Sequence, residues 1–201
     1  MKLSVTIFAL LAGVCISAQA TTISIGNLPG GQPVPIADSA GTIISKGGGF
    51  AAIGTFAAGT AFSDVAGISG AFQQFGNSTA LTIADGLYQN TVTATVAGSA
   101  FSAASVFSVV GNGSDLASST ALLVIDHGFS FVDEPGATDG AVVSTASNAV
   151  FGSSLGGLVV NGTAFDGFQM AGGGGGPVIP EPSSALLGLL GLSFLVFRRR
   201  K

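Results

Sequence analysis

The sequence predicts a mainly β protein, an antiparallel β-sandwich or a barrel-like variant of one, with one short helix and an apolar helix at each end. Short apolar runs lie between glycine-rich turns, and glycine supplies 32 of the 201 residues. One run, Thr91–Val96, alternates hydroxyl and apolar side chains, which is typical of a strand with one exposed and one buried face. Segments this short, between such frequent turn signals, favour a sandwich or barrel over βαβ units.

The first 20 residues have the three parts of a secretory signal peptide, in the expected order. A short positive region, Met1-Lys2, precedes the apolar residues 3–16, and Ala18-Gln19-Ala20 then supplies the small residues that a signal peptidase recognises. We therefore expect cleavage after Ala20. Cys15 lies within this segment, so the mature chain is expected to contain no cysteine and no disulfide.

Residues 21–171 are predicted to form the exported β domain. Ala121–Ile125 is continuously apolar, which indicates a strand that is covered on both faces. Phe50–Phe56 and Ser105–Val110 are similar, and each is bounded by a glycine-rich turn. Weaker candidate strands are Thr22–Ile25, Thr42–Ser45, Phe129–Val132, Leu158–Asn161 and Ala164–Gln169.

One segment of the domain has helical rather than strand periodicity. Between Asp64 and Phe75, four apolar residues recur at helical spacing, and Asp64 is suited to cap the amino end. Gly67 and Gly70 each cost about 1 kcal/mol relative to alanine inside a helix. We expect a short helix that is held by packing across one end of the sandwich, with its apolar stripe in the core.

The carboxyl-terminal region divides into a linker, residues 172–179, and a sorting or anchor segment, residues 180–201. Five consecutive glycines open the linker, a composition typical of linkers. Pro180-Glu181-Pro182 then prevents a helix from continuing back through this point. The uncharged segment 183–197 follows, and the chain then carries the cations Arg198, Arg199, Arg200 and Lys201.

The apolar segment 183–197 predicts a single transmembrane helix that is short for its task. Fifteen helical residues span about 22 Å, less than the roughly 30 Å of a hydrocarbon layer. The terminal cations would lie on the cytoplasmic side and act as a stop. A permanent tail anchor and a temporary one have the same pattern here.

The Pro-Glu-Pro triplet, the apolar helix and the basic cluster together resemble the PEP-CTERM sorting signal of Gram-negative bacteria. The resemblance covers residues 180–201 only. It implies export, transient retention in the inner membrane and processing near the motif by an exosortase, a membrane-embedded cysteine protease. It also implies a cell-surface or extracellular destination, often in bacteria that make exopolysaccharide.

The charge of the predicted exported part excludes a nucleic-acid partner. Between Thr21 and Ile179 there are nine acidic residues and one cation, Lys46, which give a net charge of −8. Nucleic acid and anionic lipid surfaces would repel such a body. The 15 phenylalanines fit core positions, and the absence of tryptophan makes an exposed stacking surface for sugars less favourable.

Catalytic patterns are incomplete in this sequence. Residues 152–156 match the G-x-S-x-G nucleophile elbow of hydrolases, which needs a following helix and a later histidine. The only histidine, His127, comes earlier, and the next residues predict a strand. We therefore interpret the match as a glycine-serine turn, and Asp126-His127 as a strand end followed by a turn.

The acidic residues Asp126, Asp133, Glu134 and Asp139 are the strongest candidate ligands for a cofactor. Calcium binds six to eight oxygen atoms, and acidic loops supply them. The spacing differs from that of an EF-hand loop, so a solvated acidic turn is the alternative. No zinc ligand set is present.

These observations predict a non-enzymatic exported protein whose β domain is a structural or adhesive unit of the cell surface or biofilm matrix. Signal peptidase and an exosortase would process it, and the inner membrane would hold it transiently. The alternative is a surface module that binds exopolysaccharide or calcium, and a hydrolase is a distant third. Pairing of exposed apolar strands into fibres is a further hypothesis.

Overall fold

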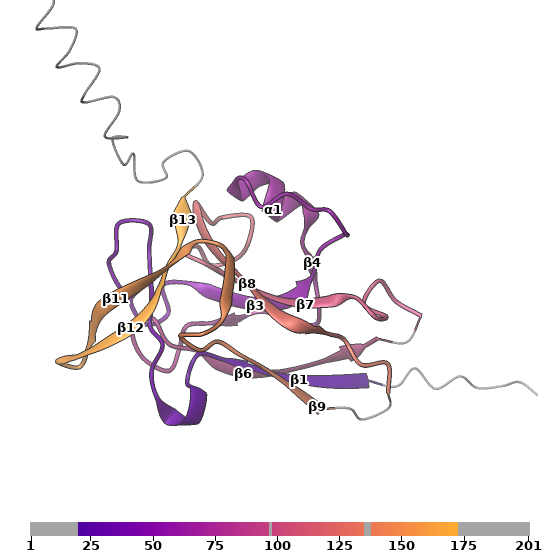
Figure 1. The fold of residues 1–201 in the computed structure, drawn as a ribbon, viewed down its shortest axis with the longest axis horizontal. Helices are drawn as coiled ribbons and strands as arrows, with labels where there is room; N and C mark the ends of the chain where they lie inside the picture. Colours follow the sequence, from indigo (N-terminus) through magenta and orange to yellow (C-terminus); the bar gives the residue numbers. More distant parts are fainter. Residues whose placement is uncertain (1–19, 97, 135–137, 173–201) are drawn as a thin grey trace, which may run out of the picture.

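The computed structural model describes residues 20–96, 98–134 and 138–172 of the chain. These residues are mainly β structure, with one α-helix, and form three sheets, none of which closes on itself (Figure 1). The first described strand begins at Ala20 and the last ends at Gly172. No helix within the described ranges has the length and apolar character needed to span a membrane.

The first sheet has three strands and contains the amino-terminal strand of the domain at its centre. Its order is β6 (Gln89–Thr95), β1 (Ala20–Gly26) and β9 (Thr138–Val142). Strand β1 pairs antiparallel with β6 and parallel with β9. Its residues alternate between the two faces, so Ile23 and Ile25 are buried while Thr22 and Ser24 are partly exposed.

The second sheet has seven strands and forms the middle layer in Figure 1. Its main path runs β10 (Asn148–Phe151), β8 (Ala121–Ser130), β7 (Ser105–Gly111), β3 (Phe50–Thr55) and β4 (Gln73–Gln74). Two further short strands join it: β5 (Thr79–Ala80) pairs with β3, and β13 (Ala171–Gly172) pairs with β8.

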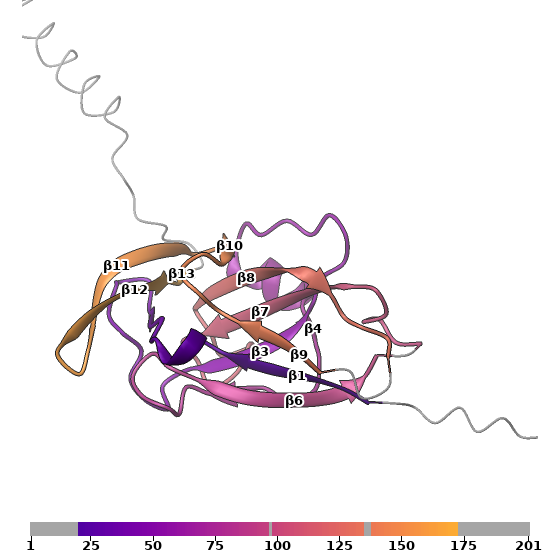
Figure 2. The ribbon, with the colours of Figure 1, turned by 60° about the horizontal axis from the view of Figure 1, so that its bottom comes forward.

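The third sheet lies at one end of the domain, where a hairpin extends from the rest (Figure 2). It consists of β11 (Ser153–Val160) and β12 (Thr163–Gln169), which pair antiparallel, and of the short β2 (Ile36–Ala37), which pairs parallel with β12. Asn161 and Gly162 form the turn of the hairpin, and both have positive φ, as a two-residue hairpin turn requires. A short 3₁₀ turn, η1, covers Pro29–Gly31.

The seven-stranded sheet is covered on both faces by apolar side chains. Along β8, Leu123 and Ile125 belong to the core shared with the sheet of β6, β1 and β9. Leu122 and Val124 belong to a second core on the opposite face. Helix α1 (Val65–Ala71) packs on that second face. The continuous apolar run 121–125 is therefore an interior strand with two buried faces, as the sequence predicts.

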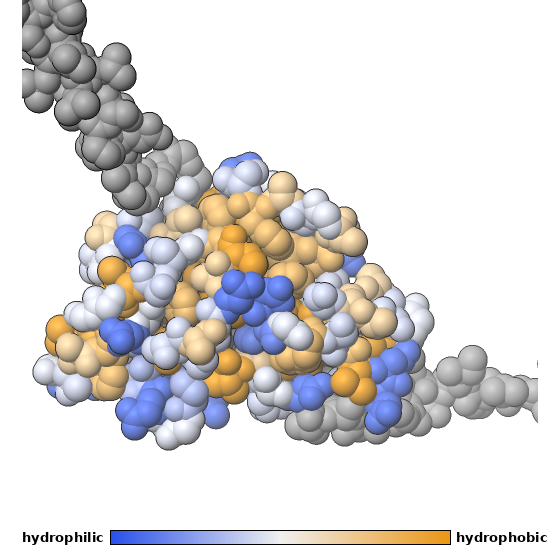
Figure 3. All heavy atoms as spheres, viewed as in Figure 1, coloured by the Kyte–Doolittle hydropathy of each residue, from blue (hydrophilic) through white to orange (hydrophobic). Residues whose placement is uncertain are grey.

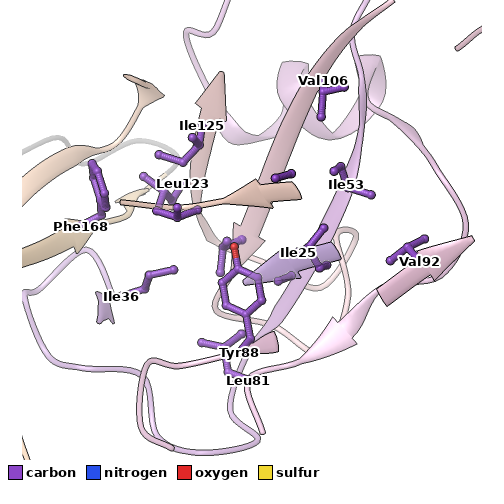
Figure 4. Close-up of a cluster of buried hydrophobic side chains, with 14 of the residues drawn as sticks. Ile25, Ile36, Ile53, Leu81, Tyr88, Val92, Val106, Leu123, Ile125 and Phe168 are labelled. Atoms are coloured by element: carbon purple, nitrogen blue, oxygen red, sulfur yellow. The ribbon is translucent and has the colours of Figure 1, made fainter. Parts of the chain in front are cut away.

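Two buried polar residues lie at the centre of the larger core. Tyr88 is fully buried and its hydroxyl points toward Leu123 and Ile125 (Figure 4). Beside it, Asn27 is also fully buried, and its side chain joins three segments. The Asn27 Nδ2 donates to the carbonyls of Val34 and Gly86, both at 2.8 Å, and its Oδ1 accepts from the Tyr88 N–H at 2.8 Å. All the hydrogen-bonding groups of this amide have partners, as burial demands.

The antiparallel expectation is wrong for two strand pairs. The pairs β1–β9 and β2–β12 are parallel, and the strands of each pair are separated by the long stretch of chain that a parallel connection needs. The barrel-like variant is also wrong, since no sheet closes. Segment 42–45 is not a strand: Ile43 forms only an isolated bridge with Ala37, although the Ile44 N–H donates to the carbonyl of Ile36 in β2.

The helix is shorter than the sequence predicts and lies elsewhere. Asp64 caps it, its Oδ1 accepting from the Gly67 N–H at 2.7 Å, but the helix ends at Ala71. Phe72 adopts an extended backbone, and the apolar stripe divides, because Ile68 packs in the second core and Phe75 in the first. Since α1 covers a sheet face, the expected place at one end of the domain is also wrong.

Candidate functional site

The strand β8 changes direction near its end, and a polar hollow lies beside this bend. Phe107 of β7 pairs with Asp126, but Ser105 pairs with Ser130, so β8 has extra residues between these two pairs. Gly128 lies in this stretch with a φ of +69°, which glycine adopts without strain. Such a bulge turns a strand away from its partner and redirects the side chains beside it.

The hollow beside this bulge has a volume of about 470 Å³ and lies between β8, β9 and the start of β10. Figure 3 shows hydrophilic residues gathered in the middle of one face of the domain and hydrophobic residues above them, toward α1. The hollow combines an acid, an imidazole, an amide and one aromatic ring. These lining residues include Asp126, His127, Asn148 and Phe129.

His127 forms the one contact in this region that resembles a catalytic pair. Its Nε2 lies 2.8 Å from the Ser108 Oγ on the neighbouring strand β7, and the two atoms share a hydrogen bond. Burial lowers the pKa of His127 to about 4, while the nearby charge of Asp126 opposes that shift. The imidazole is therefore neutral at pH 7, so that one ring nitrogen donates a hydrogen bond and the other accepts one.

Ser108 is buried in the core, where a substrate in the hollow would not reach it. Its exposed fraction is 1%, and it does not line the hollow. A nucleophile must reach the reacting atom, so this pair lacks the access that acyl transfer needs. Burial raises the pKa of Tyr88 in the same core, where its hydroxyl has no hydrogen-bond partner among the described residues.

The structure corrects the local interpretation of Asp126 and His127. Both lie within β8, which continues to Ser130, so His127 is a strand residue and not a turn residue. The predicted strand 129–132 is in part the end of the same β8. Sequence reasoning missed Ser108, although a single hydroxyl in the apolar run of β7 is a signal that a polar partner lies across the sheet.

The four carboxylates considered as calcium ligands are not gathered into one site. Asp126 Oδ1 accepts from the Gly128 N–H at 2.9 Å, and Asp133 Oδ2 accepts from the Ser102 hydroxyl at 3.2 Å. Glu134 is exposed beside Asp133, and Asp139 lies on β9 with one buried carboxylate oxygen that has no hydrogen-bond partner. Among the described residues, no group of three or more acidic, histidine or cysteine side chains could hold a metal ion.

The segment that matches the nucleophile elbow has strand geometry. Ser153 begins β11, which continues to Val160, so no helix follows the serine. The interpretation as a glycine-serine turn is therefore wrong in detail, because the turn is confined to Gly152 with a φ of +97°. The strand–turn–helix context that the elbow requires is not formed here.

The predicted processing residues lie at the limits of the described structure. Ala20 is the first residue of β1, while Ala18 lies outside the described residues. The apolar segments at the two ends and the sorting residues Pro180, Glu181 and Pro182 are also outside them, together with the basic cluster 198–201.

Comparison with known proteins gives one match. Residues 178–201 match the model of the PEP-CTERM protein-sorting motif. The chain carries a PEP-CTERM sorting motif. This motif marks an exported protein that an exosortase processes and that reaches the cell surface by way of the membrane. The chain has no match among the curated proteins or the solved structures that were searched.

Proposed function

We propose that the protein is a non-enzymatic component of the cell surface or extracellular matrix. Its β domain is carried through the inner membrane, released by exosortase processing, and then acts as a structural or adhesive unit. The observation that carries this proposal is the PEP-CTERM motif at residues 178–201. An amino-terminal signal peptide, residues 1–20, begins export, and the cations 198–201 hold the carboxyl end in the cytoplasm until processing.

The character of the β domain supports a structural role. Both faces of its largest sheet are packed, so the body resists unfolding without disulfides. Ser108, the hydroxyl nearest to the single histidine, is buried away from the hollow. A net charge of −8 between Thr21 and Ile179 would keep the released domain soluble and away from anionic membranes.

Mass spectrometry of the ends of the protein recovered from the cell surface and from the inner membrane tests this proposal. We expect surface protein that begins at Thr21 and lacks the basic cluster, and membrane protein that retains it. Deletion of the exosortase gene is expected to abolish the surface form. Surface protein that still carries residues 198–201 would contradict release by processing.

A second candidate function, binding of exopolysaccharide, is favoured by the hollow beside β8. The Asn148 side chain and the Phe129 ring line a space that could hold a sugar residue, and Phe129 would provide a stacking surface. Binding of the surface protein to native exopolysaccharide, with and without EDTA, tests it. We expect Asn148→Ala to weaken binding, whereas the matched Asn77→Ala, at an exposed loop position outside the hollow, should leave it unchanged. Equal binding by the two variants would exclude the hollow.

A further inference from the structure

The hollow beside β8 has one charged side chain among the described residues that line it. That residue is Asp126, and the neighbouring imidazole of His127 is neutral at pH 7 because burial lowers its pKa to about 4. Lys46, the single cation between Thr21 and Ile179, does not line the hollow. The described walls of the hollow therefore carry a negative charge without a cation beside it, in a body whose net charge is −8.

The Asp126 carboxylate is held in place by the bulge of β8. Its Oδ1 accepts from the Gly128 N–H at 2.9 Å, so Oδ2 is the oxygen left to bind a ligand. Asn148 of β10 lies directly opposite Asp126 in the strand register, and opposite residues of antiparallel strands place their side chains next to each other on one face. A carboxylate, which accepts from a cation, is thus beside an amide, which both donates to and accepts from hydroxyl groups.

An aromatic ring lies near these polar groups. Phe129 is partly buried against the larger core and also lines the hollow, two residues after His127 on β8. The centroids of the Phe129 and His127 rings are 6.0 Å apart, and their planes form an angle of 53°. The Phe129 ring therefore offers an apolar surface on which the C–H face of a sugar ring can pack.

Another wall of the hollow is the outer edge of β9. The Val143 N–H donates to a carbonyl of β1 at 2.8 Å, and successive residues of a strand direct their backbone groups to opposite sides, so Gly140 and Val142 direct theirs away from β1. Both residues line the hollow, and Gly140 has no side chain to cover its backbone. The open edge ends at Ser144, whose N–H and carbonyl both bond with Ser147 in a turn.

A ligand that fits these walls needs a cationic group, hydroxyl groups and an apolar ring face. A sugar with a free amino group has all three, whereas its N-acetylated form lacks the charge and an acidic sugar carries the opposite charge. An added peptide strand fits less well, because the open edge within the hollow has two residues and strands usually have at least about three.

We propose that the hollow beside β8 binds a polysaccharide that carries free amino groups, with an ammonium group at Asp126, a sugar ring on Phe129, and hydroxyl groups at Asn148 and the edge of β9. The inference deepens the second candidate function, binding of exopolysaccharide, and rests on it. The acidic body attracts such a polymer from a distance, and Asp126 selects the amino sugar within the hollow.

Calorimetric titration of the full-length protein, in micelles of an uncharged detergent, tests this inference. The two probes are the tetramer of chitosan, built of glucosamine, and the tetramer of chitin, built of N-acetylglucosamine. At about pH 6 the chitosan amino groups carry charge while His127 remains neutral. We expect the chitosan tetramer to bind at least about 10-fold more tightly, because hydrogen bonds between charged groups are the stronger ones.

Two matched variants separate the hollow from the overall charge. Asp126→Asn removes the charge but keeps an oxygen for the Gly128 N–H, so the bulge is retained. It should weaken binding of the chitosan tetramer by about 10-fold and leave binding of the chitin tetramer unchanged. Asp166→Asn removes an exposed carboxylate of β12 outside the hollow and should bind both tetramers as the parent does. Equal losses in the two variants would overturn the inference, because net charge alone would then attract the polymer.

The remaining outcomes distinguish this inference from the candidate function on which it rests. Equal affinity of the parent for the two tetramers would overturn the preference for amino groups and leave polysaccharide binding in place. Tetralysine should fail to displace the chitosan tetramer at equal concentration, and displacement would overturn the inference in favour of a cationic peptide. Absence of binding by both tetramers would overturn the inference, and the candidate function would fall with it only if native exopolysaccharide also failed to bind.

Discussion

The two ends of the β domain differ in how much strand pairing lies next to the predicted processing signals. At the amino end, the predicted cleavage site is continuous with β1, which pairs through seven residues on one side and five on the other. At the carboxyl end, β13 pairs through only two residues, and seven more precede Pro180. The two ends of the described domain are therefore held by very different amounts of strand pairing.

The amino-acid sequence explains the difference between these ends. Strand β1 alternates hydroxyl and isoleucine residues, so Ile23 and Ile25 bind it to the larger core. Strand β13 has only Ala171 and Gly172, and the following residues 173–176 are all glycine, with no side chain to bury. The amino-terminal strand is thus held by hydrophobic burial, whereas β13 has no large side chain to bury.

The largest effect is expected at the carboxyl end. Replacement of Pro180, Glu181 and Pro182 by alanine removes the features of the sorting motif and is expected to abolish exosortase processing. Immunoblots of membrane and surface fractions measure the ratio of precursor to released protein. Asp166→Ala, which removes an exposed acid from β12, is the matched control and should be processed normally. Normal release of the triple variant would break the contrast between the two ends.

Stability should distinguish the two terminal strands. Ile23→Ala in β1 deletes a fully buried side chain, and we expect it to lower the free energy of unfolding by about 2–5 kcal/mol. Ala171→Gly in β13 should lower it by only about 0.5–1 kcal/mol. Urea denaturation of the surface protein measures both values. Similar losses for the two variants would show that β13 is as integrated as β1.

Acid should lower the stability of the fold through His127. His127 lies on β8, the partner of β13, and its pKa is about 4 in the fold against the ordinary value of 6.5. Between these values the unfolded chain binds a proton and the folded chain does not, so stability is complete above about pH 6.5 and falls as the pH decreases to 4. The loss is about 3 kcal/mol.

Urea denaturation between pH 7 and pH 4.5 measures this dependence, with His127→Gln as the control. The glutamine variant should lose the dependence in this range, because an amide side chain does not titrate there. Asp64 and Asp115, whose pKa values are lowered by hydrogen bonds at their turns, contribute only at lower pH. A slope that persists in the variant would assign the acid sensitivity to another group.

A smaller effect is expected from the hydroxyl at the amino end. Thr21→Val keeps the shape of a buried side chain but removes its hydrogen bond to the Val132 carbonyl, at a cost of about 1 kcal/mol. Thr22→Val, on the partly exposed face of β1, should cost less because its hydroxyl contacts only Thr93 at the surface. Thermal unfolding of both variants measures the difference, and a reversed order would contradict the buried placement of Thr21.

Calcium should have the smallest effect. Asp133 and Glu134 directly follow Val132, near the amino end of β1, but they form no ligand set with Asp126 and Asp139 within the described residues. Thermal unfolding with calcium and with EDTA is therefore expected to give the same Tm. A rise in Tm that Asp133→Asn removes would restore the acidic turn as a binding site.

The strands with strong side-chain patterns could be predicted, and those defined by distant partners could not. Alternation located β6, and continuous apolar runs located β3, β7 and β8. Strand β9, with Asp139 and Gly140, has no such pattern and exists because β1 and the core lie beside it. The sequence predicts too long a helix because Phe75 continues the helical spacing, although it packs in a different core from the helix.

The candidate site was less predictable because it depends on contacts across the sheet. His127 and Ser108 are 19 residues apart and meet only through the register of β7 and β8. The hollow also depends on a bulge at Gly128, which the local sequence signals only weakly. By contrast, the sorting motif is a continuous segment, and its residues could be recognised without the fold.

The unequal attachment of the two terminal strands also determines how the domain would bear mechanical load. A pull on the carboxyl end strains the two residue pairs of β13 first, and these can peel from β8 one after the other. A pull on Thr21 must slide β1 between two neighbours and draw Ile23 and Ile25 out of the core at once. While it is tethered through its carboxyl end, the domain would therefore yield first at that end, and the sheet around β1 would remain whole.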